Sequence, residues 1–163
     1  MDSNKKQKTG KKRNQYTVFM AMLGASFVAM YITMYLNTYQ WDHVYFSLTR
    51  FYMTCLGISA MAVIMLTAML KMYGNQAKNI AIYLGSLVLF GSATYLVRAQ
   101  KPVDDVTWMK AMIPHHSIAI LTSSRADIQD PEAKKLAEEI IEAQAREIAQ
   151  MKKIIYRLEN DEK

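Results

Sequence analysis

Three long runs of apolar residues fill most of the first two thirds of this 163-residue chain and limit its fold more than any other feature. They cover residues 16–37, 51–70 and 80–97. Each is close to the roughly 20 residues that a helix needs to cross the hydrocarbon core of a bilayer. A cleaved signal peptide would have a shorter apolar stretch followed by a cleavage site of small residues, and none is evident. We therefore expect three transmembrane helices within a domain of residues 16–101.

Charge is divided unevenly along the chain. Up to Lys101 there are 11 Lys/Arg and 2 Asp/Glu, whereas the remainder has 9 Lys/Arg and 12 Asp/Glu. Much of the basic excess lies in a polar tail, residues 1–15, that directly precedes the first apolar run. The net charge of +6 therefore indicates membrane topology and not a surface that binds nucleic acid.

The basic residues also predict an orientation. The tail and the connection 71–78 together hold eight Lys/Arg, whereas the short connections on the other side hold Arg50, Arg98 and Lys101. The positive-inside rule then places the amino terminus in the cytoplasm and, after three crossings, residues 102–163 outside it. In a bacterium this would be a multi-pass protein of the inner (cytoplasmic) membrane with a periplasmic or extracellular carboxyl-terminal domain.

The connection between the first two runs is rich in aromatic residues that suit the membrane interface. It also contains Asp42 and His43. A single histidine in a loop is expected to be solvated, so we assign these two residues no role from the sequence.

Residues after Lys101 have the pattern of two amphipathic helices. Asp104 or Asp105 can cap a helix that runs to about Ser124, and Asp130 can cap a second that runs to about Glu159. The second has an apolar seam at alternating spacings of three and four residues, with one polar member. The seam residues are Ala137, Ile141, Gln144, Ile148, Met151, Ile155 and Leu158.

Two helices joined by a short turn form an antiparallel hairpin. About 60 residues in two helices cannot enclose a core by themselves. The expected fold is therefore all-α: three transmembrane helices followed by an extracytoplasmic antiparallel hairpin that dimerises into a four-helix bundle. A homodimer or higher homo-oligomer and the lipid bilayer are the expected partners.

Soft metal-binding groups are concentrated at the start of the hairpin. On a helix, Met109 and His116 lie about 20° apart, with Met112 between them one turn from each. The rest of this stripe is apolar, as at Ile113 and Ile120. A histidine on an apolar seam needs a hydrogen-bond partner or a metal.

Antiparallel pairing would bring this stripe towards Gln144, Glu147 and Met151. Imidazole and thioether groups suit a soft ion such as Cu(I) or Ag(I), whereas hard ions require oxygen ligands. The single cysteine, Cys55, lies inside an apolar run, which excludes a thiolate site or a disulfide framework within one chain. Alternatively, His116 and Gln144 would hydrogen-bond to each other and specify helix pairing.

Residues 105–119, 130–137 and 144–151, with the motif Met-Ile-Pro-His-His, closely resemble the bacterial family called domain of unknown function 305. The resemblance extends over about residues 103–158. It implies a ferritin-like helical bundle, and some periplasmic members bind copper or silver through methionine and histidine. The candidate ligands that it implies are Met109, Met112, His115, His116 and Met151, supported by Asp105, Gln144 and Glu147.

The leading functional hypothesis is a membrane-anchored extracytoplasmic protein that binds Cu(I) or Ag(I) for metal buffering or resistance. One alternative is a structural or assembly protein without metal. Another is a metal-ion transporter, since Met61, Met65, Met69 and Met72 form a stripe on the second span and Met30 and Met34 recur on the first. An enzyme is not expected, because paired Glu-x-x-His, His-Glu-x-x-His, nucleophile-elbow and phosphate-loop motifs are absent from the sequence.

Overall fold

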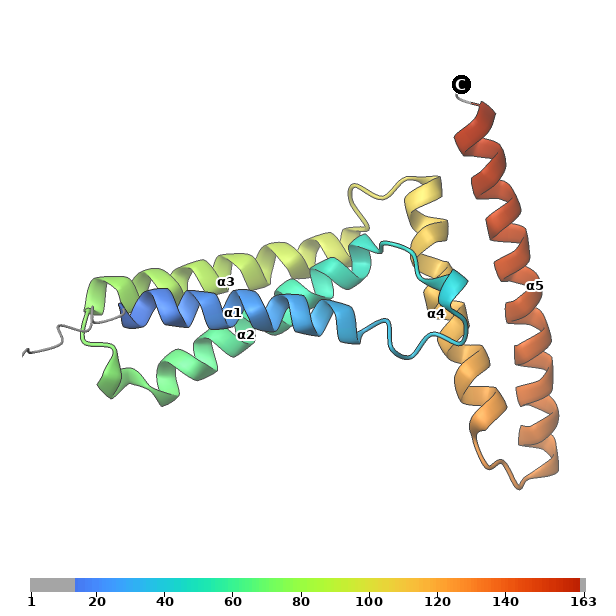
Figure 1. Cartoon of the computed structure of the whole chain (residues 1–163), viewed down its shortest axis with the longest axis horizontal. Helices are drawn as coiled ribbons and strands as arrows, with labels where there is room; N and C mark the ends of the chain where they lie inside the picture. The colour runs from blue at the N-terminus through green and yellow to red at the C-terminus, as the bar shows by residue number, and fades with distance from the viewer. Residues whose placement is uncertain (1–13, 162–163) are drawn as a thin grey trace, which may run out of the picture.

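A computed structural model describes residues 14–161 of the chain. This part contains α-helices and two short 3-10 helices, with no strand, so the predicted all-α class is confirmed (Figure 1). The elements are α1 (Gln15–Thr33), η1 (Trp41–His43), α2 (Leu48–Ala68), η2 (Leu70–Met72), α3 (Gln76–Ala99), α4 (Asp105–Arg125) and α5 (Pro131–Asp161). The predicted basic tail lies outside the described residues except for its last two positions.

Helices α1, α2 and α3 are long and apolar enough to cross a membrane, with mean hydropathies of 1.6, 1.8 and 1.8. Their ends differ from the predicted ones by a few residues. Helix α2 begins early because Ser47 caps it by accepting the Arg50 amide, at 3.2 Å. Helix α3 begins early because Asn75 accepts the Lys78 amide, at 3.0 Å. Hydropathy does not detect such polar first turns.

The three apolar helices form their own core around α2, which packs against both α1 and α3. Phe19 and Leu66 are fully buried in it, and Met30, Met61, Met65 and Met69 pack around this core. A Cβ atom on Gly57 would lie 2.9 Å from the sulfur of Met30, so the methionine packs directly on the glycine backbone. Four of the methionines that suggested transport, Met30, Met61, Met65 and Met69, therefore serve as packing groups between helices, whereas Met72 is exposed.

Helices α4 and α5 form the predicted antiparallel hairpin. Asp104 caps α4 by accepting the Thr107 amide at 2.7 Å, and Asp130 accepts the Ala133 amide at 2.8 Å just before α5. Helix α4 continues through Pro114. The hairpin has a separate core consisting of Met109, Ile113, Ile120, Ile148, Met151 and Ile155. Most of the seam predicted for α5 is thus confirmed.

The hairpin lies across one end of the three apolar helices, with α4 next to them and α5 on the far side (Figure 1). The connection between α1 and α2 extends to the hairpin, where η1 contacts α4 and Tyr45 packs against the hairpin core. This connection therefore covers one broad face of the hairpin, so part of the shielding expected from a second copy comes from the chain itself.

Candidate metal site

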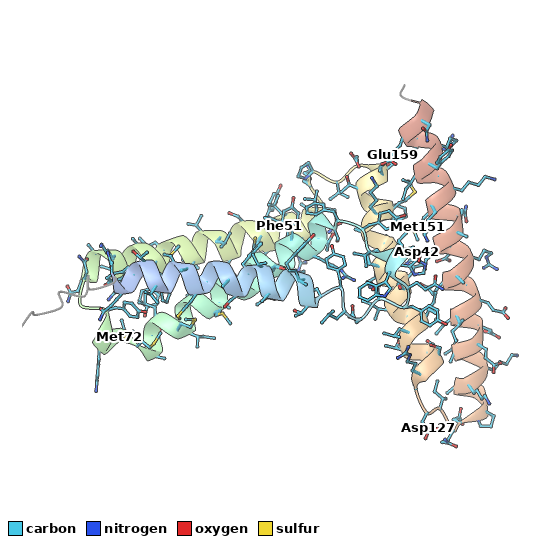
Figure 2. All side chains as sticks on the ribbon, viewed as in Figure 1. Asp42, Phe51, Met72, Asp127, Met151 and Glu159 are labelled. Atoms are coloured by element: carbon cyan, nitrogen blue, oxygen red, sulfur yellow. The ribbon has the colours of Figure 1, made fainter. Side chains whose placement is uncertain are left out.

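Most of the predicted soft ligands lie together in a cavity of about 390 Å³ between α4 and α5. Figure 2 shows side chains filling the space between these helices, with Met151 in the half of α5 nearer the C-terminus. The lining residues are Trp108, Met109, Met112, His116, Glu147, Gln150, Met151 and Ile154. Three thioethers, one imidazole and one carboxylate thus share one cavity.

The three methionines of the cavity differ in burial. Met109 and Met151 are 4% and 7% exposed and belong to the hairpin core, whereas Met112 is half-buried beside them. Met112 follows Met109 by one helical turn, and the antiparallel pairing brings Met151 opposite them. Thioether sulfurs are weak, polarisable ligands, so this set favours a soft monovalent ion over a hard divalent one.

Both ring nitrogens of His116 face an acceptor. Nδ1 lies 3.1 Å from the carbonyl oxygen of Met112, and Nε2 lies 2.7 Å from Oε2 of Glu147. With protons on both nitrogens, the imidazolium would donate to both oxygens. With a proton on Nδ1 alone, the Met112 carbonyl fixes the tautomer and Nε2 has a lone pair for a metal, the arrangement usual for a histidine ligand.

The remaining predicted residues lie elsewhere. His115 is exposed and does not line the cavity, since the next helical position points away from it. Asp105 is exposed in the first turn of α4, and Gln144 is half-buried outside the cavity lining. The alternative prediction of a hydrogen bond between His116 and Gln144 is wrong. Nε2 of His116 instead faces Glu147, which lies nearly one turn beyond Gln144 on α5.

Trp108 and Gln150 line the cavity and were not predicted. Helical spacing could have predicted both residues. Trp108 precedes Met112 by four residues and Gln150 follows Glu147 by three, so each lies next to a cavity residue on the same helix surface. Among residues 14–161 no group of three or more His, Cys, Asp or Glu side chains could hold a metal.

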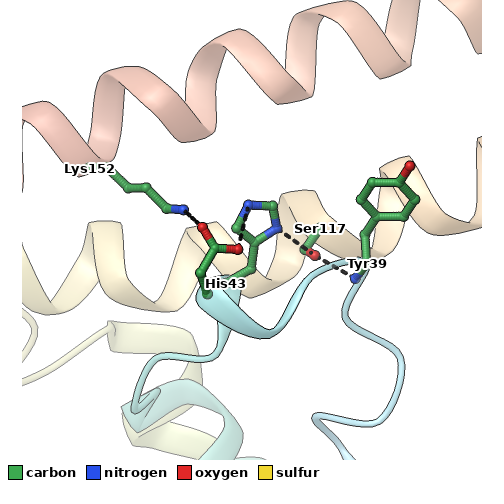
Figure 3. Close-up of polar contacts among 5 residues, drawn as sticks. Tyr39, His43, Ser117 and Lys152 are labelled. Atoms are coloured by element: carbon green, nitrogen blue, oxygen red, sulfur yellow. Dashed lines mark hydrogen bonds and ion pairs between the residues drawn. The ribbon is translucent and has the colours of Figure 1, made fainter.

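A second polar cluster joins the α1–α2 connection to the hairpin (Figure 3). His43 Nδ1 lies 3.0 Å from the hydroxyl oxygen of Ser117, which accepts the backbone N–H of Tyr39 at 2.7 Å. Lys152 donates to Asp42 at 2.6 Å, and Asp42 lies 3.7 Å from His43 Nε2. We call these five residues the loop clamp.

Burial determines what the loop clamp can do. His43 is only 6% exposed and Ser117 is fully buried, so the expectation of a solvated His43 is wrong. A serine, a histidine and an aspartate in a row suggest a hydrolase, but a nucleophilic serine must reach its substrate. The buried Ser117 hydroxyl instead accepts a backbone amide and can donate its proton to His43. The cluster therefore fastens the connection to α4.

Burial in the loop clamp lowers the pKa of His43 below 6.5, and the nearby Lys152 ammonium lowers it further, against the opposing effect of Asp42. The hydrogen bond from Lys152 lowers the pKa of Asp42. A histidine with a lowered pKa in the folded state stabilises the fold above its unfolded pKa, and this contribution is lost as the pH falls through the folded value.

We therefore expect acid to loosen the loop clamp. Protonated His43 no longer accepts the Ser117 hydroxyl, so the melting temperature should fall as the pH drops below about 6.5. Melting curves at several pH values, for the wild type and for His43→Gln, measure this effect. The His43→Gln variant should show a smaller decline in that pH range. Equal declines in the two proteins would contradict the prediction.

Comparisons with known proteins agree with the resemblance of the hairpin to the domain of unknown function 305 family. A model of the family described as domain of unknown function (DUF305) matches residues 92–155, from the end of α3 into α5. An uncharacterized protein of Acanthamoeba polyphaga mimivirus is 32% identical over 142 residues, which cover 85% of this chain and 91% of the relative. A match of this length extends beyond the hairpin into the apolar helices. No solved structure matches the chain significantly.

Proposed function

We propose that this chain, which belongs to the family of the mimivirus protein and carries a DUF305 domain in its hairpin, is a membrane-anchored protein that binds a soft metal ion. The proposed cargo is Cu(I) or Ag(I), held in the cavity between α4 and α5. The proposed role is metal buffering or resistance and not catalysis.

The observation that carries the proposal is the composition of that cavity. Met109, Met112 and Met151 supply three thioethers, and His116 supplies an imidazole whose Nδ1 faces a backbone carbonyl. Glu147 is placed to accept a hydrogen bond from Nε2 before an ion binds and to balance the charge of the cation afterwards. A site without thiols also suits an oxidising compartment.

The proposed orientation places the hairpin outside the cytoplasm. Three helices that can each cross a membrane, with basic connections at one end, support it. Since the relative is viral, the proposal concerns orientation across a membrane and not the expected bacterial inner membrane in particular. Labelling a cysteine placed at exposed Gln129 with a membrane-impermeant maleimide on intact cells tests it. Labelling only after the cells are opened would exclude the orientation.

A purely structural role is the second candidate, because His116 and Glu147 satisfy each other without metal. Thermal melting separates the two functions. An ion that binds only the folded state, at about 100 times its Kd, adds about 2.7 kcal/mol and should raise the midpoint by roughly 5–10 °C. We expect this increase when Ag(I) is added to the full-length protein in detergent. An unchanged midpoint would favour the structural role.

Transport is the weaker alternative. Met61, Met65 and Met69 pack against the core of the apolar helices. Their packing explains their presence without an ion path.

A further inference from the structure

One broad face of the hairpin is left open in the single chain. The α1–α2 connection covers the other broad face through Tyr45 and the loop clamp. The open face runs along both helices and includes Trp108, Met112, Leu136, Glu147, Gln150 and Ile154. Trp108 is 51% exposed and Leu136 is 56% exposed, and the two residues lie near opposite ends of the hairpin. The metal cavity opens onto this face.

We infer that a second copy of this chain packs against the open face as a two-fold dimer, with the two α5 helices antiparallel, and that it closes the metal cavity. The inference rests on the proposed membrane anchoring. The metal site is then incomplete in a single chain.

The direction follows from the shape of the molecule. The apolar helices of two copies in one bilayer must point the same way, so the two-fold axis must run along them. Helix α5 lies across that direction (Figure 1). A half-turn about the axis therefore reverses α5, and the partner's α5 must run antiparallel to it. A parallel pairing of the α5 helices would point the two sets of apolar helices in opposite directions, so they could not both lie in one bilayer.

The charges along α5 fit an antiparallel pair. Glu139 lies in its first half and Arg157 in its second half; both are exposed, and both lie about 80° from Glu147 around the helix, at the edge of the open face. Parallel copies would bring like charges together, whereas antiparallel copies bring opposite charges together. A centre between Glu147 and Ile148 places Glu139 close to the partner's Arg157.

The same register places the axis at the metal cavity. Glu147, the hydrogen-bond partner of His116, lies at the centre, so the partner's Glu147 comes over the opening of the cavity. Two carboxylates brought together repel each other, and a cation bound at His116 would offset this repulsion, so ion binding should strengthen a dimer that already forms without it. His115, which lies outside the cavity of its own chain, is on the helix surface that turns towards the partner.

A charge-reversal experiment on the full-length protein in detergent tests the inference. Glu139→Lys and Arg157→Glu should each weaken the dimer about tenfold, because each substitution creates two like-charge contacts per dimer. The double variant Glu139→Lys/Arg157→Glu should restore the wild-type dimer affinity. Both positions are exposed on α5, so helicity measured by circular dichroism should stay constant and serves as the control.

The dimer affinity is measured by light scattering at several protein concentrations after treatment with a chelator. A monomeric wild type, or single variants that dimerise as well as the wild type, would overturn the inference. So would a double variant that fails to recover. Because the metal is removed, a dimer with this pattern supports the interface even if Ag(I) does not bind. Conversely, Ag(I) binding by a monomer would support the proposed function and exclude this dimer.

Discussion

Replacing Met109, Met112 and Met151 with leucine should lower the affinity of the protein for Ag(I) by about 100-fold or more, because all three thioethers leave the cavity. Leucine is close to methionine in volume, and such exchanges usually cost less than about 1.5 kcal/mol each in a core. The hairpin should therefore stay folded while its ligands are lost. Equilibrium dialysis of the full-length protein against Ag(I) measures the affinity.

A methionine outside the cavity provides the matched control. Met72 is 46% exposed in η2, at the far end of the apolar helices from the hairpin, so Met72→Leu should leave Ag(I) binding unchanged (Figure 2). Equal affinity in the triple variant and in the wild type would show that the thioethers do not bind the ion. A loss of affinity in Met72→Leu as large as in the triple variant would point to binding outside the cavity.

Ser117→Ala should detach the α1–α2 connection from the hairpin at a cost of about 1–3 kcal/mol, because the Tyr39 amide and the buried His43 ring both lose a partner. The change is local and keeps α4 intact, since alanine is a good helix former. Hydrogen exchange measured by mass spectrometry on residues 38–46 should become faster by roughly 5- to 100-fold, which corresponds to the same free energy.

Ser124→Ala is the control for that experiment. Ser124 is exposed on the same helix, and its hydroxyl donates to the Leu121 carbonyl of its own turn. Its loss should not change exchange in the connection. If exchange is equally slow in Ser117→Ala and in the wild type, the loop clamp does not hold the connection, and the ion pair between Asp42 and Lys152 or the packing of Tyr45 must do so.

Much of the candidate site could be predicted from helical spacing. Met109, Met112 and His116 lie three and four residues apart, which is enough to place them on one surface of α4. The antiparallel turn then places Met151 and Glu147 opposite. The resemblance also implied His115, Asp105 and Gln144. Spacing places His115 roughly 100° from His116 on the helix, so adjacency in sequence does not bring it into the same cavity.

His43 shows why the remaining contacts could not be predicted. It is separated from Ser117 by 74 positions, and an aromatic connection between two apolar runs gives no indication of which hairpin residue it will meet. A seemingly ordinary serine on α4 proves to be the buried acceptor that fixes the connection. Contacts of this kind depend on how separate elements pack, and no local pattern in either segment records them.

The sequence alone determined the properties that repeat along a helix. Hydropathy identified the three apolar helices, capping residues such as Asp104 and Asp130 marked the starts of α4 and α5, and the seam on α5 identified its buried side. Each of these depends on residues within a few turns of one another.

Only the tertiary structure decided which side of the hairpin is covered and which side is open. The α1–α2 connection brings His43 and Tyr45 onto one face and leaves the cavity beside His116 exposed on the other. That choice depends on burial and hydrogen bonding between segments far apart in the sequence. The free energy of such contacts exists only once the elements have packed together.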